Sequence, residues 1–227
     1  MVTPLPPAQP APDNSAANLV VEPLTAVNFA YAQFTGDMGL FADLGAAIMR
    51  QYEKAGVTGQ GTNFPLFTHG YLNQDTRSQI SPDILKWVQD CSQAYLERQA
   101  PYLNINVTAE TIHPLWGNVN KAGEYHAAHN HGMGEYVLSG VFFVSTPSDL
   151  KNEGEGLLIL ERSQLPSVEG RFDMVYRAGE KLPVRPMPGW LVLFPPFVRH
   201  YVTPHMSSQP RVSVAFNVLS SAVVGPK

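Results

Sequence analysis

Four of the seven histidines in this 227-residue sequence lie within a span of nineteen residues: His113, His126, His129 and His131. If the segment is extended, His129 and His131 point to the same side, because side chains alternate along a strand, and both imidazoles can reach one ion. Imidazole is a ligand for iron, zinc, copper and nickel. The H-x-H spacing therefore predicts part of a metal site. The alternative is a solvent-facing strand end with incidental histidines.

A second segment supplies another histidine and a cation. The apolar run Trp190–Phe194 predicts a buried strand, and the two prolines that follow it predict a turn that leads to His200. Arg211 comes eleven positions after His200 and shares one strand face with Ser213. A guanidinium at this place can form a forked pair with a carboxylate. The alternative for Arg211 is a side chain that reaches solvent from a strand.

These motifs together are similar to a known family. The residues that carry the similarity are Trp116-Gly117-Asn118, Gly123, His129-x-His131, Leu138-Ser139-Gly140-Val141, Leu193-Phe194-Pro195, His200 and Arg211-x-Ser213-x-x-Phe216-Asn217. They resemble the 2-oxoglutarate/iron(II)-dependent oxygenases, in an H-x-H…H…R-x-S variant, over residues 112 to 219. Ala128 and Phe143 stand where the family has proline and tyrosine.

The resemblance implies a fold, an activity and a set of cofactors. It implies a double-stranded β-helix in which His129, His131 and His200 hold Fe(II), while Arg211 and Ser213 anchor 2-oxoglutarate. Dioxygen is the second co-substrate. The implied reaction is hydroxylation of a C–H bond in a small molecule or in an amino-acid or peptide side chain, with release of succinate and CO2.

One ligand departs from the wider superfamily, because His131 stands where most members carry a carboxylate. Glu135 is a candidate fourth ligand, or else an exposed loop acid. Asn118 and Asn120 are candidates to hydrogen-bond the keto acid, or else cap strand edges. Further candidates for contact with the substrate or with the ligands are His126, His113 and Trp116.

Two other functions remain open at this level. The first is a cupin-type metal dioxygenase or isomerase that uses the three histidines without 2-oxoglutarate, in which Arg211 would be dispensable. The second is a non-catalytic β-barrel binding module, whose histidines are incidental or hold a structural zinc.

The elements that must position these residues divide into helices and then strands. Ser81-Pro82-Asp83 predicts a capped helix start, and an earlier helix is predicted to end near Gly56. We therefore predict an α+β protein, a jelly-roll, cupin-like barrel with N-terminal packing helices. Residues 1–18 are predicted to be a disordered Pro/Ala-rich tail. Residues 19–227 form one predicted domain, with helices at about 38–99 and the β-helix core at about 102–220.

Composition excludes some classes of partner. The net charge of −4 and the pI of about 5.9 argue against a nucleic-acid binder. No run of eighteen apolar residues occurs, which argues against a membrane span. Cys91 is the single cysteine and can form no intrachain disulfide, so we predict a cytoplasmic protein. A homodimer is compatible with the sequence.

Overall fold

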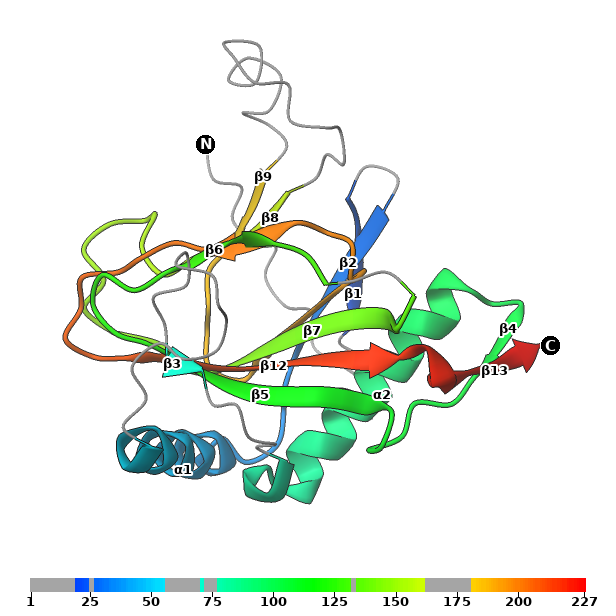
Figure 1. The fold of residues 1–227 in the computed structure, drawn as a ribbon, viewed down its shortest axis with the longest axis horizontal. Coiled ribbons are helices and arrows are strands. Elements are labelled where there is room, and N and C mark those ends of the chain that lie inside the picture. Colours follow the sequence, from blue (N-terminus) through cyan, green and yellow to red (C-terminus); the bar gives the residue numbers. More distant parts are fainter. Residues whose placement is uncertain (1–18, 25–26, 56–69, 72–76, 132–133, 162–180) are drawn as a thin grey trace, which may run out of the picture.

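The computed structural model describes residues 19–24, 27–55, 70–71, 77–131, 134–161 and 181–227 (Figure 1). The helical elements are α1 (Gly39–Ala55), η1 (Arg77–Gln79), α2 (Pro82–Gln99) and η2 (Ser220–Ala222). The strands are β1 (Val20–Leu24), β2 (Val27–Gln33), β3 (Gly70–Tyr71), β4 (Leu103–Ile105), β5 (Ile112–Asn120), β6 (His126–His129), β7 (Tyr136–Ser145), β8 (Leu158–Glu161), β9 (Lys181–Val184), β10 (Trp190–Phe194), β11 (His200–Val202), β12 (Arg211–Leu219) and β13 (Val223–Pro226).

The larger sheet has seven strands in the order β1-β2-β10-β7-β12-β5-β3. Within it, β12 pairs antiparallel with β5 on one side and with β7, the central strand, on the other. The register places Arg211 opposite Asn120 and Ser213 opposite Asn118. Residues that are more than ninety positions apart in the sequence therefore lie side by side on one sheet face.

The smaller sheet has four strands in the order β6-β11-β8-β9 and lies across the larger sheet (Figure 1). Among the described residues no strand of one sheet pairs with a strand of the other, so the two sheets face each other without closing into a barrel. The predicted double-stranded β-helix with N-terminal helices is confirmed, with this correction to the predicted barrel closure.

Helices α1 and α2 cover the outer face of the larger sheet, because each has one apolar side (Figure 1). Helix α2 begins as its sequence predicts: the Ser81 side chain accepts a hydrogen bond from the Ile84 N–H, and Pro82 occupies the first helical turn. The residues of α1 and α2 that pack into this layer include Phe41, Ile48 and Trp87. Cys91 is buried there as well, and burial raises the pKa of its thiol to about 12.

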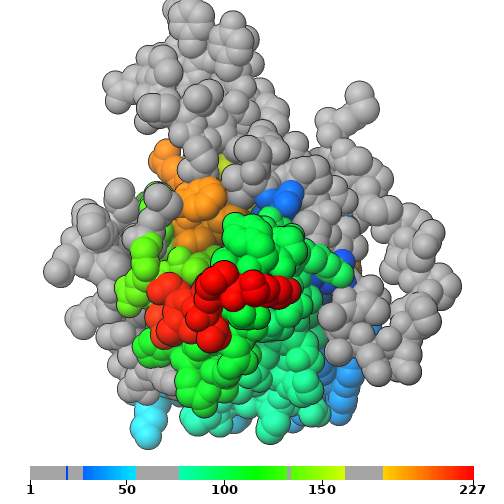
Figure 2. All heavy atoms as spheres, turned by 90° about the vertical axis from the view of Figure 1, so that its right-hand side faces the viewer, coloured from blue at the N-terminus to red at the C-terminus, as the bar shows by residue number. Residues whose placement is uncertain are grey.

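A second apolar cluster fills the space between the two sheets. It contains Phe143 and Val192 from the larger sheet and Leu160 and Val202 from the smaller one. At the end of the molecule shown in Figure 2, β13 pairs with β4 beside α2, and the Lys227 N–H donates to the Tyr102 carbonyl at 2.9 Å. The C-terminus is thereby attached to the element that follows α2.

Several expectations fall outside what the structure describes. The predicted tail, residues 1–18, lies outside the described residues, and the extent of the single domain stays a prediction. None of the described helices is long and apolar enough to cross a membrane.

Candidate metal centre and anion pocket

Three histidines from two parts of the chain converge between the sheets. His129, His131 and His200 each offer a ring nitrogen, and these nitrogens all lie within 4.8 Å of one another. The ring centroids of His129 and His200 are 4.3 Å apart, and those of His131 and His200 are 5.2 Å apart. The three side chains that sequence motifs singled out as metal ligands therefore form one cluster.

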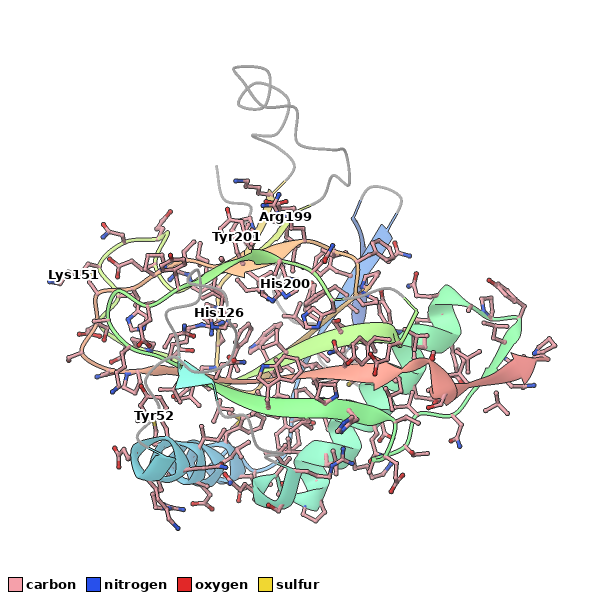
Figure 3. All side chains as sticks on the ribbon, viewed as in Figure 1. Tyr52, His126, Lys151, Arg199, His200 and Tyr201 are labelled. Atoms are coloured by element: carbon pink, nitrogen blue, oxygen red, sulfur yellow. The ribbon has the colours of Figure 1, made fainter. Side chains whose placement is uncertain are left out.

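The smaller sheet positions two of these rings through strand pairing. His129 is the last residue of β6 and lies opposite His200, the first residue of β11. In Figure 3, His200 lies between the sheets, whereas its neighbours Arg199 and Tyr201 lie on the outer side, as strand alternation requires. Hydrogen bonding across two strands therefore brings together histidines separated by 71 positions.

His131 is placed differently from what the H-x-H alternation predicts. Strand β6 ends at His129, so His131 lies beyond the strand and not on it. Its backbone N–H donates to the Pro196 carbonyl at 2.8 Å, which ties this residue to the turn between β10 and β11. The prediction that both rings converge is correct, but the turn contact replaces strand geometry as the reason.

Hydrogen bonds from Nδ1 to backbone carbonyls orient two of the three rings. The Nδ1–H of His129 donates to the Ala127 carbonyl at 2.8 Å, and the Nδ1–H of His200 donates to the Val198 carbonyl at 2.9 Å. Such contacts fix the imidazole tautomer and its orientation. Each ring can then direct its Nε2 lone pair toward one ion.

Burial keeps the three rings uncharged. Desolvation is the main cause that lowers the pKa of His129, and it lowers the pKa of His200 well below its usual value. The pKa of His131 falls to about 4, through desolvation and the neighbouring His129, while a hydrogen bond with the Asn217 side chain opposes the shift. Neutral imidazole is the form that binds a metal ion, so the cluster is prepared to do so at neutral pH.

A polar side chain and an aromatic ring from the larger sheet lie against His131. The Trp116 ring of β5 stacks on the imidazole with 6.0 Å between centroids and 28° between planes. Asn217 of β12 is buried and accepts a hydrogen bond at 2.7 Å from the hydroxyl of Ser139, its register partner on β7. The sequence analysis singled out Trp116 but gave Asn217 no role, although strand alternation places Asn217 on the face of Arg211 and could have found it.

At the start of β12, Arg211 is a buried cation without a carboxylate partner among the described residues. Its side chain is 1% exposed, and burial lowers its pKa to about 10. Nη1 donates to the Asn120 Oδ1 and to the Ser213 Oγ, both at 3.2 Å, and the guanidinium carbon lies 5.3 Å from the centroid of the Phe143 ring. A desolvated charge paired only with neutral groups predicts that an anion binds here.

Unsatisfied polar atoms surround this guanidinium. Within the described part of the chain, the Arg211 Nε, the Asn120 Nδ2 and the Asn118 Oδ1 are buried and have no hydrogen-bond partner. Buried polar atoms of native proteins nearly always have partners, so a group of neighbouring exceptions indicates a ligand or ordered water. These donors and acceptors lie together on the inner face of β5 and β12, since Asn120 and Asn118 are the register partners of Arg211 and Ser213.

His205 is a buried neighbour of Asn120 that the sequence analysis missed. Its ring is 1% exposed, and its Nε2–H donates to the Asn120 carbonyl at 3.1 Å. Arg211 donates to the side-chain oxygen of the same Asn120, so the two side chains contact one common residue. His205 lies in the loop between β11 and β12, where no regular periodicity could have predicted its orientation.

The other predicted residues lie at different distances from the cluster. Glu135 is exposed and does not belong to the group of three side chains that could hold a metal ion. His113 is exposed on β5. His126, on β6, is half-buried and lies between the sheets in Figure 3.

The fold and this cluster define a class of protein, the metal-dependent oxygenases built on a double-stranded β-helix. Residues 114–217, just under half of the chain, match the family described as "Putative 2OG-Fe(II) oxygenase". This match confirms, over these residues, the resemblance that the sequence motifs indicated. No curated protein matches the sequence.

Solved structures of similar fold agree with this class. A Pseudomonas putida prolyl-4-hydroxylase has a TM-score of 0.56 at 13% identity, over 86% of this chain and 95% of that one. SnoK, a non-haem α-ketoglutarate-dependent carbocyclase from nogalamycin biosynthesis, has a TM-score of 0.59 at 12% identity, over 84% and 79% of the two chains. A Trichoplax adhaerens prolyl hydroxylase, in complex with a peptide fragment, has a TM-score of 0.52 at 12% identity, over 85% and 84%. At such identities the likeness concerns the fold.

The residues present fit the cofactors of this family, which are Fe(II), 2-oxoglutarate and O2. Three neutral imidazoles offer nitrogen ligands of a type that iron accepts. The buried Arg211 with its unsatisfied neighbours fits a carboxylate. Because the three histidines carry no negative charge, a dianionic keto acid would supply the anion that a carboxylate ligand contributes in other members.

Proposed function

We propose that this protein is an Fe(II)/2-oxoglutarate-dependent hydroxylase that acts on a small molecule or on an amino-acid or peptide side chain. The observation that supports it most strongly is the buried Arg211, which has no carboxylate partner among the described residues and lies on the face of the larger sheet that is turned toward the smaller sheet. A metal enzyme that did not use a keto acid would have no need of this cation. In the proposal, His129, His131 and His200 hold the iron.

Side chains of β5, β7 and β12 make separate contacts with 2-oxoglutarate in this proposal. Arg211 pairs with its distal carboxylate, and Ser213, whose hydroxyl already contacts the guanidinium, adds a hydrogen bond. Asn118 and Asn120 offer amide groups to the same molecule along β5. The Phe143 ring lies against the guanidinium of Arg211 and excludes water from that side of it.

When bound, iron and 2-oxoglutarate together supply the oxidising power by which O2 is activated and a substrate C–H bond is attacked. The protein positions the co-substrate and the substrate and excludes water from the site. Trp116, which stacks on His131, is our candidate for a substrate contact, since it lies at the ligand cluster on the larger sheet. His126, half-buried between the sheets, is a second candidate.

Substrate and outcome are proposed from the neighbours and the site. Two neighbours are described as prolyl hydroxylases, and one of these holds a peptide fragment. We therefore propose prolyl peptides as the first substrates to test, with a mass increase of one oxygen as the product signature. Other neighbours are described as a carbocyclase and an epimerase, so the same screen includes small cyclic metabolites.

The test is an anaerobic titration of the Fe(II)-loaded protein with 2-oxoglutarate, followed by the visible charge-transfer band of the chelated keto acid. We expect a band in the wild type and a concentration requirement about 100-fold higher in Arg211→Ala, because two charge-assisted contacts are lost. Ser148→Ala, in an exposed loop, is a matched control that should leave the titration unchanged.

Each negative result has a separate meaning. If iron binds but no band forms, the cupin-type alternative without a keto acid is correct. If the band forms equally in Arg211→Ala, the assignment of Arg211 is wrong. If no iron binds to the wild type, the three-histidine assignment is wrong.

A further inference from the structure

His131 is held by different contacts from the other two candidate ligands. The rings of His129 and His200 each contact a backbone carbonyl two residues earlier in the chain, at 2.8 and 2.9 Å. His131 follows the end of β6, and its backbone N–H donates to the Pro196 carbonyl at 2.8 Å. That hydrogen bond fixes the backbone of His131, so the direction of its imidazole depends on contacts of the ring itself.

Two rings lie in nearly parallel planes to the His131 imidazole. One is the ring of His200, with 5.2 Å between centroids and 15° between planes, and the other is the indole of Trp116, with 6.0 Å and 28°. His200 is a candidate ligand of the same ion, so Trp116 is the stacking partner from outside the ligand set. Aromatic pairs at such separations attract each other beyond the burial of their area, and the stack restricts how the imidazole can tilt.

Strand pairing explains how the indole comes to lie there. Trp116 on β5 is half-buried and is the register partner of Ala215 on β12. Alternation along the two strands places both residues on the face that carries Asn118 and Ser213. The side chain of Ala215 is a single methyl group and leaves room for a large neighbour. Trp116 therefore reaches His131 from the larger sheet, whereas His131 follows a strand of the smaller one.

We propose that Trp116 is a positioning residue of His131 and that its indole favours the metal-bound form of this imidazole. The imidazole binds a metal ion as a neutral ring, and the cation then withdraws electrons from it. The face of an indole carries a negative potential and attracts an electron-poor ring more strongly than a neutral one. The stack should therefore stabilise the iron-loaded protein more than the apoprotein, which raises the affinity for Fe(II).

This inference rests on the proposed iron site. It is separate from the substrate contact proposed above for Trp116, because its effects are measured with no substrate present.

Phe194 of β10 provides a matched comparison at a second ligand. Its ring lies 4.8 Å from the ring of His200 at an angle of 60°, so these two rings are not stacked. His200 also has its hydrogen bond to the Val198 carbonyl, which remains when the Phe194 ring is removed. Phe194→Leu should therefore weaken Fe(II) binding less than Trp116→Leu does.

The test measures Fe(II) affinity by anaerobic competition with a chromophoric chelator, and the visible spectrum of the Co(II)-loaded protein as a readout of ligand geometry. We expect about 3–10-fold weaker Fe(II) binding in Trp116→Leu, the value of one aromatic pair, and a Co(II) spectrum that differs from the wild type. Trp116→Phe, which keeps a ring in the stack, should recover part of the loss. Thermal midpoints of the apo variants separate a loss of affinity from a loss of stability.

Tryptophan fluorescence gives a second readout, since only one of the three tryptophans contacts the histidine cluster in this structure. Trp87 packs in the helix layer on the other face of the larger sheet. Trp190 begins β10, roughly 13 Å along the strand from Phe194, the residue that contacts His200. Co(II) should therefore quench mainly Trp116, and Trp116→Phe should remove most of the quenching that Co(II) causes.

The possible failures are distinguishable. Wild-type Fe(II) affinity in Trp116→Leu would overturn the inference, and so would a Trp116→Phe protein that binds no more tightly than Trp116→Leu, since packing alone would then explain the loss. An equal loss in Phe194→Leu would show that the stack is not the cause. Full quenching by Co(II) in Trp116→Phe would contradict the placement of the indole at the metal. If His131→Ala also bound Fe(II) as the wild type does, the proposed iron site itself would be wrong.

Discussion

The two faces of strand β12 are made of different kinds of residue. Toward the helices it presents the apolar side chains Val212, Val214, Phe216 and Val218, all buried in the larger cluster. Toward the smaller sheet it presents Arg211, Ser213, Ala215 and Asn217, of which three are polar and almost fully buried. Because side chains alternate along a strand, one face of β12 contributes apolar packing to the core and the other carries the polar groups proposed to bind the co-substrate.

The two faces of β12 contribute to the stability of the fold with opposite sign. The helix-facing side gains free energy from apolar burial. The inner side holds a cation without a carboxylate partner and, in the described part of the chain, several polar atoms without hydrogen bonds. Such groups cost free energy unless a ligand satisfies them. Substitutions that remove side chains should therefore lower the free energy of unfolding of the apoprotein on the helix-facing side and raise it on the inner side.

The largest effect is expected on the helix-facing side. Phe216 is fully buried, and its ring fills the space over Gly140, where a built Cβ would lie 2.3 Å from the ring. Phe216→Ala should lower the free energy of unfolding by about 3–5 kcal/mol in urea denaturation. Fe(II) affinity of the protein that remains folded should not change, and a parallel loss of affinity would show that the faces are not independent.

The second effect is a pH dependence of the stability of the apoprotein, and its cause lies on the inner side of the fold. The pKa of His131 is lowered to about 4 in the folded protein, so below about pH 6.5 the unfolded chain takes up a proton that the folded chain does not. The apoprotein should thus lose stability as pH falls from about 6.5 to about 4, by on the order of 1 kcal/mol per pH unit for this ring.

Carboxylates also titrate in this pH range, so the test compares the slope of the free energy of unfolding against pH in the wild type with the slope in a His131 variant. Urea denaturation of the apoprotein at several pH values between 7 and 4 should give a shallower dependence for His131→Gln than for the wild type. Equal slopes would contradict the burial of an uncharged imidazole at this position.

A smaller effect, of opposite sign to the first, is expected at Arg211. Arg211→Met removes a buried cation that has no described carboxylate partner and keeps an apolar side chain over Phe143. The apoprotein should become more stable by about 1–4 kcal/mol, while stabilisation by added 2-oxoglutarate disappears. Arg211→Lys, which keeps the charge, is the matched control. A destabilised Arg211→Met protein would mean that the cation is satisfied in the ligand-free fold.

The smallest effect is expected at Ser213. Its hydroxyl accepts a hydrogen bond from the Arg211 Nη1 at 3.2 Å, and we propose a second contact to the keto acid. Ser213→Ala should raise the 2-oxoglutarate concentration at half-saturation by roughly 2–10-fold in the anaerobic titration, with little change in Fe(II) affinity. Ser213→Thr, which keeps the hydroxyl, should restore part of the loss; an equal loss in both variants would argue for a steric origin.

Much of the fold followed from local patterns. The cap at Ser81 and the alternation along β12 depend on residues close in the sequence, and both elements form as predicted. The alternation also indicated that Arg211 and Ser213 share a face. What local patterns missed was the end of β6 before His131, since a contact with Pro196, 65 positions later, decides where that residue lies.

The sequence by itself determined the chemical inventory of this protein: three histidines at oxygenase spacing, an R-x-S pair, and strands whose alternation separates apolar from polar faces. Only the tertiary structure decided which polar groups meet. Asn217 reaches His131 across the gap between the sheets, and His205 reaches Asn120 from an irregular loop. The physical reason is that strand pairing and sheet packing join residues far apart in the chain, and no local periodicity encodes such contacts.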